Sequence, residues 1–216
     1  MTSTSLRITE IFHSLQGESS TVGLPTTFVR LTGCPLRCSY CDTEYAFYGG
    51  ERWALDDVVR RVVESGAPWV TVTGGEPLAQ RACMELLARL CDLGFKVSLE
   101  TSGALSIAEV DERVRVVLDL KTPGSGEVAR NLYSNLSLLK GVDELKFVIC
   151  DRQDYDWTKL KIDEFSLGAM ADRILLSPSH GTLSAPELAG WMLEDKLPYR
   201  FQLQLHKILW QDAKGR

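Results

Sequence analysis

Apolar and polar positions along the chain follow two periods, one typical of buried strands and the other of amphipathic helices. Apolar runs rich in β-branched residues predict strands at 26–33, 69–75, 96–103, 114–121, 144–150, 173–181 and 200–207. Stretches with apolar residues every three or four positions predict helices at 54–65, 78–94, 127–140, 155–171 and 185–196. Because strands alternate with helices, we expect an α/β fold with a mostly parallel sheet.

Unusual small and polar residues gather where the predicted strands end. Cys34 follows the first predicted strand, and later strands end in, or lead into, GGEP (74–77), ETSG (100–103), DLKTP (119–123) and SPSHG (177–181). Parallel α/β folds place their ligand sites at the carboxyl ends of the strands. We therefore expect these five segments to share one site.

Composition and charge are those of an ordinary globular protein. The 216 residues are 44% hydrophobic and 25% charged, which predicts a single domain spanning 1–216. The net charge of -5 argues against direct nucleic-acid binding, which needs a basic face. No apolar run approaches about 18 residues, and the N-terminus lacks a signal pattern. We expect a cytoplasmic protein without a membrane partner.

Three of the six cysteines, Cys34, Cys38 and Cys41, follow the spacing C-x₃-C-x₂-C. In a cytoplasmic chain such a close triad indicates metal binding or catalysis rather than a disulfide framework. Structural zinc and an ordinary [4Fe–4S] cluster both need four protein ligands, and the next cysteine, Cys83, falls in a predicted helix. Three cysteines therefore suggest a cluster with one iron left open. Cys91 and Cys150, like Cys83, lie in apolar patterns and are expected in the core.

The segment CPLRCSYC resembles the signature of the radical S-adenosylmethionine enzymes, and GGEP resembles their second motif. The resemblance implies a [4Fe–4S] cluster on the three cysteines, with S-adenosylmethionine bound to the open iron and cleaved to a 5′-deoxyadenosyl radical. DLK at 119–121 matches a segment that the family often writes as Ser-Pro-Lys. The residues implied to bind S-adenosylmethionine are Tyr40, Asp42, Gly75, Glu76, Ser102, Asp119 and Lys121.

A second resemblance covers nearly the whole chain. The region from EIFHSLQGE to CSYCDTEY, with TGGEP, ETSG, DLKTP and FQLQLHKILW, is similar to the 7-carboxy-7-deazaguanine synthases. This implies an incomplete (β/α) barrel of the radical S-adenosylmethionine type. It also implies a carbon–nitrogen lyase that converts 6-carboxy-5,6,7,8-tetrahydropterin to 7-carboxy-7-deazaguanine, with loss of ammonia, on the route to queuosine and related nucleosides. Mg²⁺ as a further cofactor, a homodimer, and an electron donor such as flavodoxin are implied as well.

The same resemblance implies roles in binding substrate and Mg²⁺. Thr43 would give one oxygen to Mg²⁺, a hard ion that keeps mostly water and substrate ligands. Arg30 would pair with the substrate carboxylate through its planar fork, and Glu18 would accept from the pterin amino and ring N–H groups. The residues expected at the substrate are Leu15, Gln16, Gly17, Glu18, Arg30, Thr73, Ser177 and His180. No residue is assigned as a general acid or base, and the role of His206 stays open.

Two other functions remain possible from the residues. A glycyl-radical-activating enzyme is also small and has the same cysteine spacing, but it needs a groove for a protein loop, which SLQGE upstream of the cysteines does not suggest. A non-catalytic iron–sulfur electron-transfer module needs four cluster ligands and has no use for GGEP.

Overall fold

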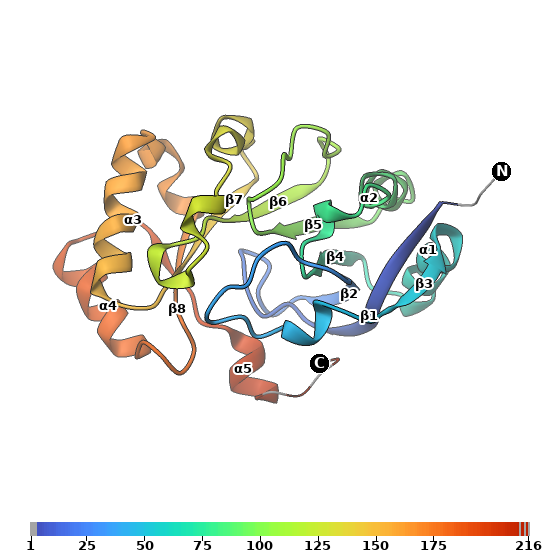
Figure 1. The fold of residues 1–216 in the computed structure, drawn as a ribbon, viewed down its shortest axis with the longest axis horizontal. Coiled ribbons are helices and arrows are strands. Elements are labelled where there is room, and N and C mark those ends of the chain that lie inside the picture. The colour runs from blue at the N-terminus through green and yellow to red at the C-terminus, as the bar shows by residue number, and fades with distance from the viewer. Residues whose placement is uncertain (1–3, 212, 214, 216) are drawn as a thin grey trace.

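One open, curved sheet forms the framework of the computed structural model, which describes residues 4–211, 213 and 215 (Figure 1). The strands of these residues have the spatial order β3-β1-β2-β4-β5-β6-β7-β8-β9. Their bounds are Ser5–Leu15 (β1), Pro25–Leu31 (β2), Glu51–Ala54 (β3), Trp69–Gly74 (β4), Lys96–Thr101 (β5), Arg115–Asp119 (β6), Glu144–Ile149 (β7), Ile174–Pro178 (β8) and Arg200–Phe201 (β9).

The sheet is parallel from β2 to β9, and at the other end β1 pairs antiparallel with both β2 and β3. β3 and β9 lie at opposite ends of the strand order and are not paired to each other, so the barrel stays incomplete. The predicted fold class, an incomplete (β/α) barrel with a mostly parallel sheet, is confirmed. β1 and β3 were not predicted as strands.

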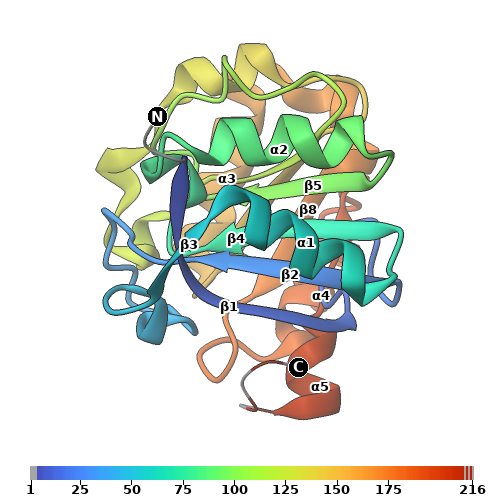
Figure 2. The ribbon, with the colours of Figure 1, turned by 90° about the vertical axis from the view of Figure 1, so that its right-hand side faces the viewer.

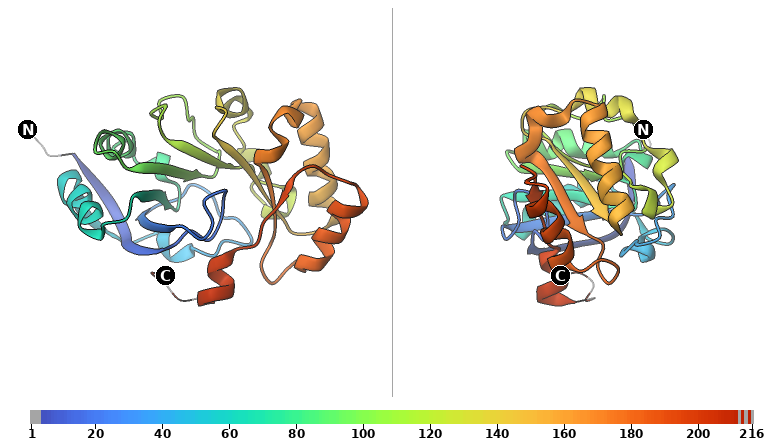
Figure 3. Two further views of the ribbon diagram at one scale, coloured as in Figure 1. Left: turned by 180° about the vertical axis from the view of Figure 1, so that it is seen from behind. Right: turned by 90° about the vertical axis from the view of Figure 1, so that its left-hand side faces the viewer.

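Five α-helices are present among the described residues: Leu55–Ser65 (α1), Cys83–Asp92 (α2), Arg152–Glu164 (α3), Ala185–Glu194 (α4) and Leu205–Trp210 (α5). Figure 2 shows α2 in front of β5 and α1 in front of β4 and β2, while α3 and α4 lie at the other end of the sheet (Figure 3). None of the helices in the described part of the chain is long and apolar enough to cross a membrane.

Two apolar clusters hold the helices against the sheet. The first joins α1 and α2 to β1, β2, β4 and β5, and the second joins α3 and α4 to β6, β7 and β8. Each fully buried Leu, Val or Phe stabilises the fold by about 1.5–3 kcal/mol. Both ends of α1 agree with the sequence pattern. Asp56 and Asp57 occupy the first turn, and Gly66 ends the helix at a φ of 73°, which favours glycine.

Two predicted elements are wrong. The helix expected at 127–140 is a series of short 3₁₀ turns, Val128–Arg130 and Tyr133–Leu138, because Asn131 and Asn135 bond the backbone of distant loops. The strand expected at 200–207 ends at Phe201. Leu205 N then donates to Gly17 O at 2.9 Å, and the chain turns into α5.

The helix expected at 78–94 begins only at Cys83, and the preceding residues serve a different purpose. The Gln80 side chain accepts from Arg7 N and donates to Arg7 O and Thr32 O, so it ties this turn to β1 and to the chain beyond β2. Cys83 is completely buried, as predicted, whereas Cys91 and Cys150 are half-buried.

Candidate active site

The predicted site segments meet at the carboxyl ends of the parallel strands, where two adjoining cavities open. The cysteine cavity is lined by all three cysteines with Tyr40, Gly75, Ser102, Asp119, Lys121 and His180, and it encloses about 1030 Å³ including its open mouth. The arginine cavity is lined by Phe12, Leu15, Gln16, Phe28, Arg30 and His206. Both are lined by Glu18, Asp42, Thr43, Thr73, Gly74, Glu100, Lys146 and Gln204. These eight residues form a shared wall.

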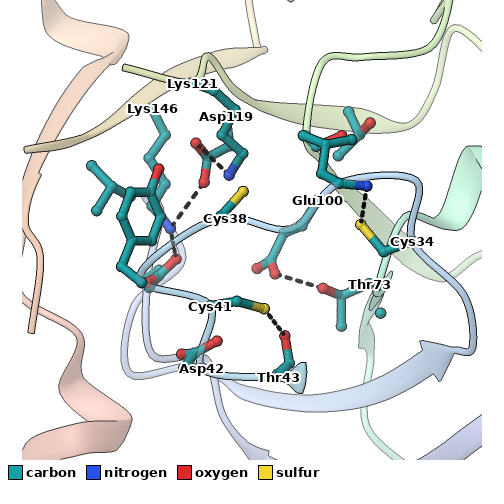
Figure 4. A pocket seen from close by; sticks show the side chains of 18 of the residues that line it. Cys34, Cys38, Cys41, Asp42, Thr43, Thr73, Glu100, Asp119, Lys121 and Lys146 are labelled. Carbon is teal, nitrogen blue, oxygen red and sulfur yellow. Dashed lines mark hydrogen bonds and ion pairs between the residues drawn. The ribbon is translucent and has the colours of Figure 1, made fainter. Parts of the chain in front are cut away.

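The cysteines lie on the cysteine loop, residues 32–50, which joins β2 to β3. Figure 4 shows them around one space, with Thr73 and Glu100 on one side of it and Asp119, Lys121 and Lys146 on another. Cys34 Sγ accepts from Leu36 N at 3.5 Å, and Cys41 Sγ lies 3.8 Å from Thr43 Oγ1. Burial raises the pKa of Cys38 to about 11, so this thiol must lose its proton when it binds a metal.

The arrangement of the three cysteines fits a cluster better than a single ion. Among the described residues, no three His, Cys, Asp or Glu side chains lie close enough together to hold one metal ion. A structural zinc would need its ligands on one centre. In a [4Fe–4S] cluster each cysteine binds a different iron, so the sulfurs line a cavity without meeting at one point.

The GGEP segment (74–77) is hydrogen-bonded through its backbone to the end of β2 and the start of the cysteine loop. Gly75 N donates to Leu31 O at 3.1 Å, and Glu76 N donates to Gly33 O at 2.7 Å. A Cβ on Gly75 would lie 2.8 Å from Cys34 Cβ and closer still to the Gly33 carbonyl. The absence of a side chain at Gly75 is therefore what allows β4 to approach the loop that carries the cysteines.

Glu76, which the resemblance implies binds S-adenosylmethionine, lines neither of the two cavities. Its fully buried carboxylate accepts from Leu78 N at 3.0 Å, Thr101 Oγ1 at 2.9 Å and Ser102 N at 2.7 Å. It also accepts from Ser102 Oγ at 2.5 Å. Glu76 thus joins the end of β4 to the end of β5 and orients Ser102, which does line the cysteine cavity.

A buried charge pair forms another wall of the cysteine cavity. Lys121 Nζ lies 3.1 Å from Asp119 Oδ1 and 5.6 Å from the centre of the Tyr40 ring. Burial acts to lower the pKa of Lys121, but the surrounding groups, led by Asp119, raise it well above its usual value. The lysine therefore stays charged beside the cysteines.

Arg30 lines the arginine cavity and gives it its name. It lies on β2 opposite Thr73 of β4, and its Nε donates to Glu10 Oε1 at 2.7 Å. Glu10 also accepts from the Tyr45 hydroxyl at 2.8 Å. In the described part of the chain, Arg30 forms its ion pair through Nε, and this contact fixes the plane of the guanidinium at the cavity wall.

Glu100 opens the ETSG segment expected at the site, but no individual role was predicted for it. It lines both cavities and accepts from Thr73 Oγ1 at 3.0 Å and from Gln16 Nε2 at 3.2 Å. Burial and the nearby charge of Glu18 raise the pKa of Glu100. The sequence contained a signal for this role, because Glu100 stands inside the apolar strand pattern KVSLET and a carboxylate is costly to bury there without a partner or a function.

Glu18 has both carboxylate oxygens engaged. Oε1 accepts from Gln204 Nε2 at 2.8 Å, and Oε2 pairs with Lys146. Lys146 and Gln204 were also missed, although Lys146 interrupts the apolar strand ELKFVI. His206, whose role was left open, lines the arginine cavity with its Nε2 3.8 Å from Asp42 Oδ2, and it packs so close to Gly17 that a Cβ there would overlap the ring.

Ser177 and His180, both expected at the substrate, differ in their relation to the cavities. Ser177 is buried within β8 and lines neither cavity. Exposed His180 and buried Ser179 line the cysteine cavity and not the arginine cavity. This loop therefore lies on the side of Tyr40, Asp119 and Lys121, and β8 is five positions from β2, which carries Arg30, in the strand order.

Comparison with known proteins agrees with this geometry. A model of the radical SAM superfamily matches residues 28–157. The 7-carboxy-7-deazaguanine synthase of Chlorobaculum tepidum is 44% identical, with 97% of each chain covered. The one of Koribacter versatilis is 41% identical over 97% of this chain and 100% of that protein.

The fold is likewise shared with a solved structure. The crystal structure of QueE from Escherichia coli matches with a TM-score of 0.71 and 24% identity, over 93% of this chain and 94% of that one. The family model covers more than half of the chain, and the relatives align along almost all of it. The chain is thus a member of the 7-carboxy-7-deazaguanine synthase family of radical S-adenosylmethionine enzymes.

Proposed function

We propose that this enzyme converts 6-carboxy-5,6,7,8-tetrahydropterin to 7-carboxy-7-deazaguanine with loss of ammonia, as a carbon–nitrogen lyase of 7-deazaguanine biosynthesis. The observation that carries the proposal is the pair of cavities with one shared wall. One cavity has three cysteines, and the other has an arginine suited to a carboxylate. A reactive cofactor and a carboxylated substrate would then lie next to each other, which favours reaction by proximity.

Cys34, Cys38 and Cys41 would hold the [4Fe–4S] cluster, whose chemistry with S-adenosylmethionine supplies the radical that abstracts a substrate hydrogen. The cavity residues of this chain bind and orient. Lys121 offers a cation, and Ser102, fixed by Glu76, offers a hydroxyl. Ser179, which is buried, lines the same cavity.

The arginine cavity suits the two ends of the pterin. Arg30 would bind the carboxylate through its planar fork. Glu100 is better placed than Glu18 to accept from the amino and ring N–H groups, because the contacts of Glu100 are neutral Thr73 and Gln16, whereas Glu18 is taken up by Lys146 and Gln204. Leu15 and Phe12 add apolar surface for the ring.

Thr43 is proposed to ligate Mg²⁺ at the shared wall. Thr43 lines both cavities, and its hydroxyl lies 3.8 Å from Cys41 Sγ, so a metal there would touch the substrate while the cluster lies close by. Thr43→Ala should raise the half-activating Mg²⁺ concentration by about 10- to 100-fold and raise the substrate KM, because one ligand is lost. Mg²⁺ titration under anaerobic turnover measures both quantities.

Thr43→Ser is the matched variant, since it keeps the hydroxyl and should stay near wild type. Cluster content and S-adenosylmethionine binding should be unchanged in both variants. The same half-activating Mg²⁺ concentration and KM in Thr43→Ala and wild type would instead assign Thr43 to a bond within its own loop.

The continuous sheet supports our proposal that residues 1–216 form one domain. A homodimer is also proposed, and it is supported by the exposed Val22, Phe201, Leu203 and Ile208 around one groove beside β9 and α5. We further propose an electron donor such as flavodoxin and a cytoplasmic location, in keeping with the reduced cluster that the reaction needs.

The proposed function is tested by the dependence of S-adenosylmethionine cleavage on substrate. With reconstituted, reduced enzyme, the carboxy-pterin should accelerate formation of 5′-deoxyadenosine, and S-adenosylmethionine should perturb the electron paramagnetic resonance spectrum of the cluster. Cleavage that responds to a peptide containing a glycyl-radical loop, but not to the pterin, would identify an activating enzyme instead. A spectrum that ignores S-adenosylmethionine would indicate an electron-transfer module.

A further inference from the structure

A lysine bridge crosses the shared wall between the two cavities. Lys146 of β7 pairs with Glu18, which follows β1, and its Nζ lies 3.7 Å from Asp119 Oδ2 at the end of β6. The flanking Leu145 and Phe147 are completely buried on the opposite face of the strand. The side chains of Glu18, Lys146 and Asp119 are only 11%, 10% and 18% exposed, so the bridge is shielded from water.

The bridge connects parts of the site that are distant in sequence. Glu18 and Lys146, 128 residues apart, line both cavities, while Asp119 lines the cysteine cavity alone. Gln204 holds the second oxygen of Glu18 from the C-terminal segment. Lys146 therefore lies between Glu18, a carboxylate of the shared wall, and Asp119, a carboxylate of the cysteine cavity that Lys121 also holds, at 3.1 Å.

Other charged groups surround the bridge. Glu100 of β5 and Asp42 of the cysteine loop add negative charge, and Arg30, Lys121, His206 and Lys207 lie at the same cavities. Lys146 lowers the pKa of both Asp42 and Glu100, although burial and Glu18 leave that of Glu100 raised. Loss of Lys146 would remove the cation that lies between Glu18 and Asp119.

We propose that Lys146 is a positioning residue: by holding Glu18 at the shared wall and Asp119 in the cysteine cavity, it fixes the substrate relative to S-adenosylmethionine and keeps Glu100 as the carboxylate open to the substrate. The inference rests on the proposed function. Lys146 itself transfers no proton or hydrogen, because its charge is bound to two carboxylates.

The test compares Lys146→Met with Lys159→Met. Lys159 is a matched control, because it also pairs with two carboxylates, Asp195 at 2.6 Å and Asp156 at 3.2 Å, but lies on α3 away from both cavities. Lys146→Met should raise the substrate KM by about 10- to 100-fold, as expected for a misplaced reactant. It should also release more 5′-deoxyadenosine per product formed, whereas Lys159→Met should match wild type in both quantities.

The pH profile gives a readout that a purely structural role would not change. Without the cation, which lowers the pKa of Glu100 in the wild type, the pKa of Glu100 should rise. Because substrate binding uses an ionised carboxylate, present above its pKa, the acid limb of kcat/KM should move to higher pH in Lys146→Met. A structural defect would lower kcat/KM equally at all pH values. Lys146→Arg retains the charge and should restore the wild-type acid limb.

Substrate binding without turnover separates this inference from the proposed function. Calorimetry of the pterin with unreduced enzyme should show weaker binding in Lys146→Met than in Lys159→Met. If Lys146→Met does not fold, Glu18→Gln breaks the same bridge and should show the same rise in 5′-deoxyadenosine per product. The role of Lys146 alone would be overturned if wild type forms product and folded Lys146→Met keeps the wild-type KM, the wild-type ratio of 5′-deoxyadenosine to product and the wild-type acid limb. If wild type forms no product, the proposed function itself would be overturned.

Discussion

Cys34→Ala, Cys38→Ala and Cys41→Ala are each expected to lose the [4Fe–4S] cluster and to form no product. The three sulfurs line one cavity at the carboxyl ends of the strands, and no fourth cysteine lines it to replace a missing ligand. Iron and sulfide content, the brown absorbance of the reconstituted protein and anaerobic turnover measure the loss.

Cys83→Ala is the control for the cysteine variants. Cys83 is completely buried in the cluster between α1, α2 and the sheet, so its loss costs packing but no ligand. It should reconstitute to the iron content of wild type and keep most of the activity. Equal loss of iron in all four variants would contradict the assignment of the triad.

Gly75→Ala is expected to disturb the cluster without changing any ligand. The new Cβ would overlap the Gly33 carbonyl and lie 2.8 Å from Cys34 Cβ, so the cysteine loop must move. Overpacking of this kind costs about 1–3 kcal/mol, which lowers Tm by roughly 2–12 °C in a chain of this size. A displacement near 1 Å should reduce turnover by about 100-fold.

Gly141→Ala controls for the change of residue type, because a Cβ at Gly141 meets nothing within 4 Å and its φ is not positive. It should keep the Tm, cluster content and turnover of wild type. Thermal unfolding and iron analysis of the two variants decide the point. A Gly75→Ala protein with wild-type cluster content and turnover would show that close approach of β4 to the cysteine loop is unnecessary.

Sequence periodicity located the parallel strands and the main helices because their burial is regular. It failed where hydrogen bonds to residues elsewhere in the chain replace the local backbone bonds. Asn131 and Asn135 convert an expected helix into turns, and the bond from Leu205 to Gly17 ends an expected strand. Such contacts join residues far apart in the chain, and no local pattern encodes them.

The cysteine triad was readable from sequence because its chemistry depends on spacing within one loop. The shared wall between the two cavities could not be predicted from the sequence in this way. Lys146 and Glu18 meet across 128 residues, and Glu100 becomes a site residue only because β5 lies beside β4 in the sheet. Conversely, Glu76 and Ser177 lie in motifs near the site, yet the fold places both side chains outside the cavities.

Mass analysis of the product is the measurement that tests the central claim most directly. The anaerobically reconstituted enzyme would be incubated with 6-carboxy-5,6,7,8-tetrahydropterin, S-adenosylmethionine, Mg²⁺ and a reductant. A product lighter than the substrate by one ammonia, with the properties of 7-carboxy-7-deazaguanine, is the predicted result. Unchanged pterin beside an intact reduced cluster and cleaved S-adenosylmethionine would contradict it.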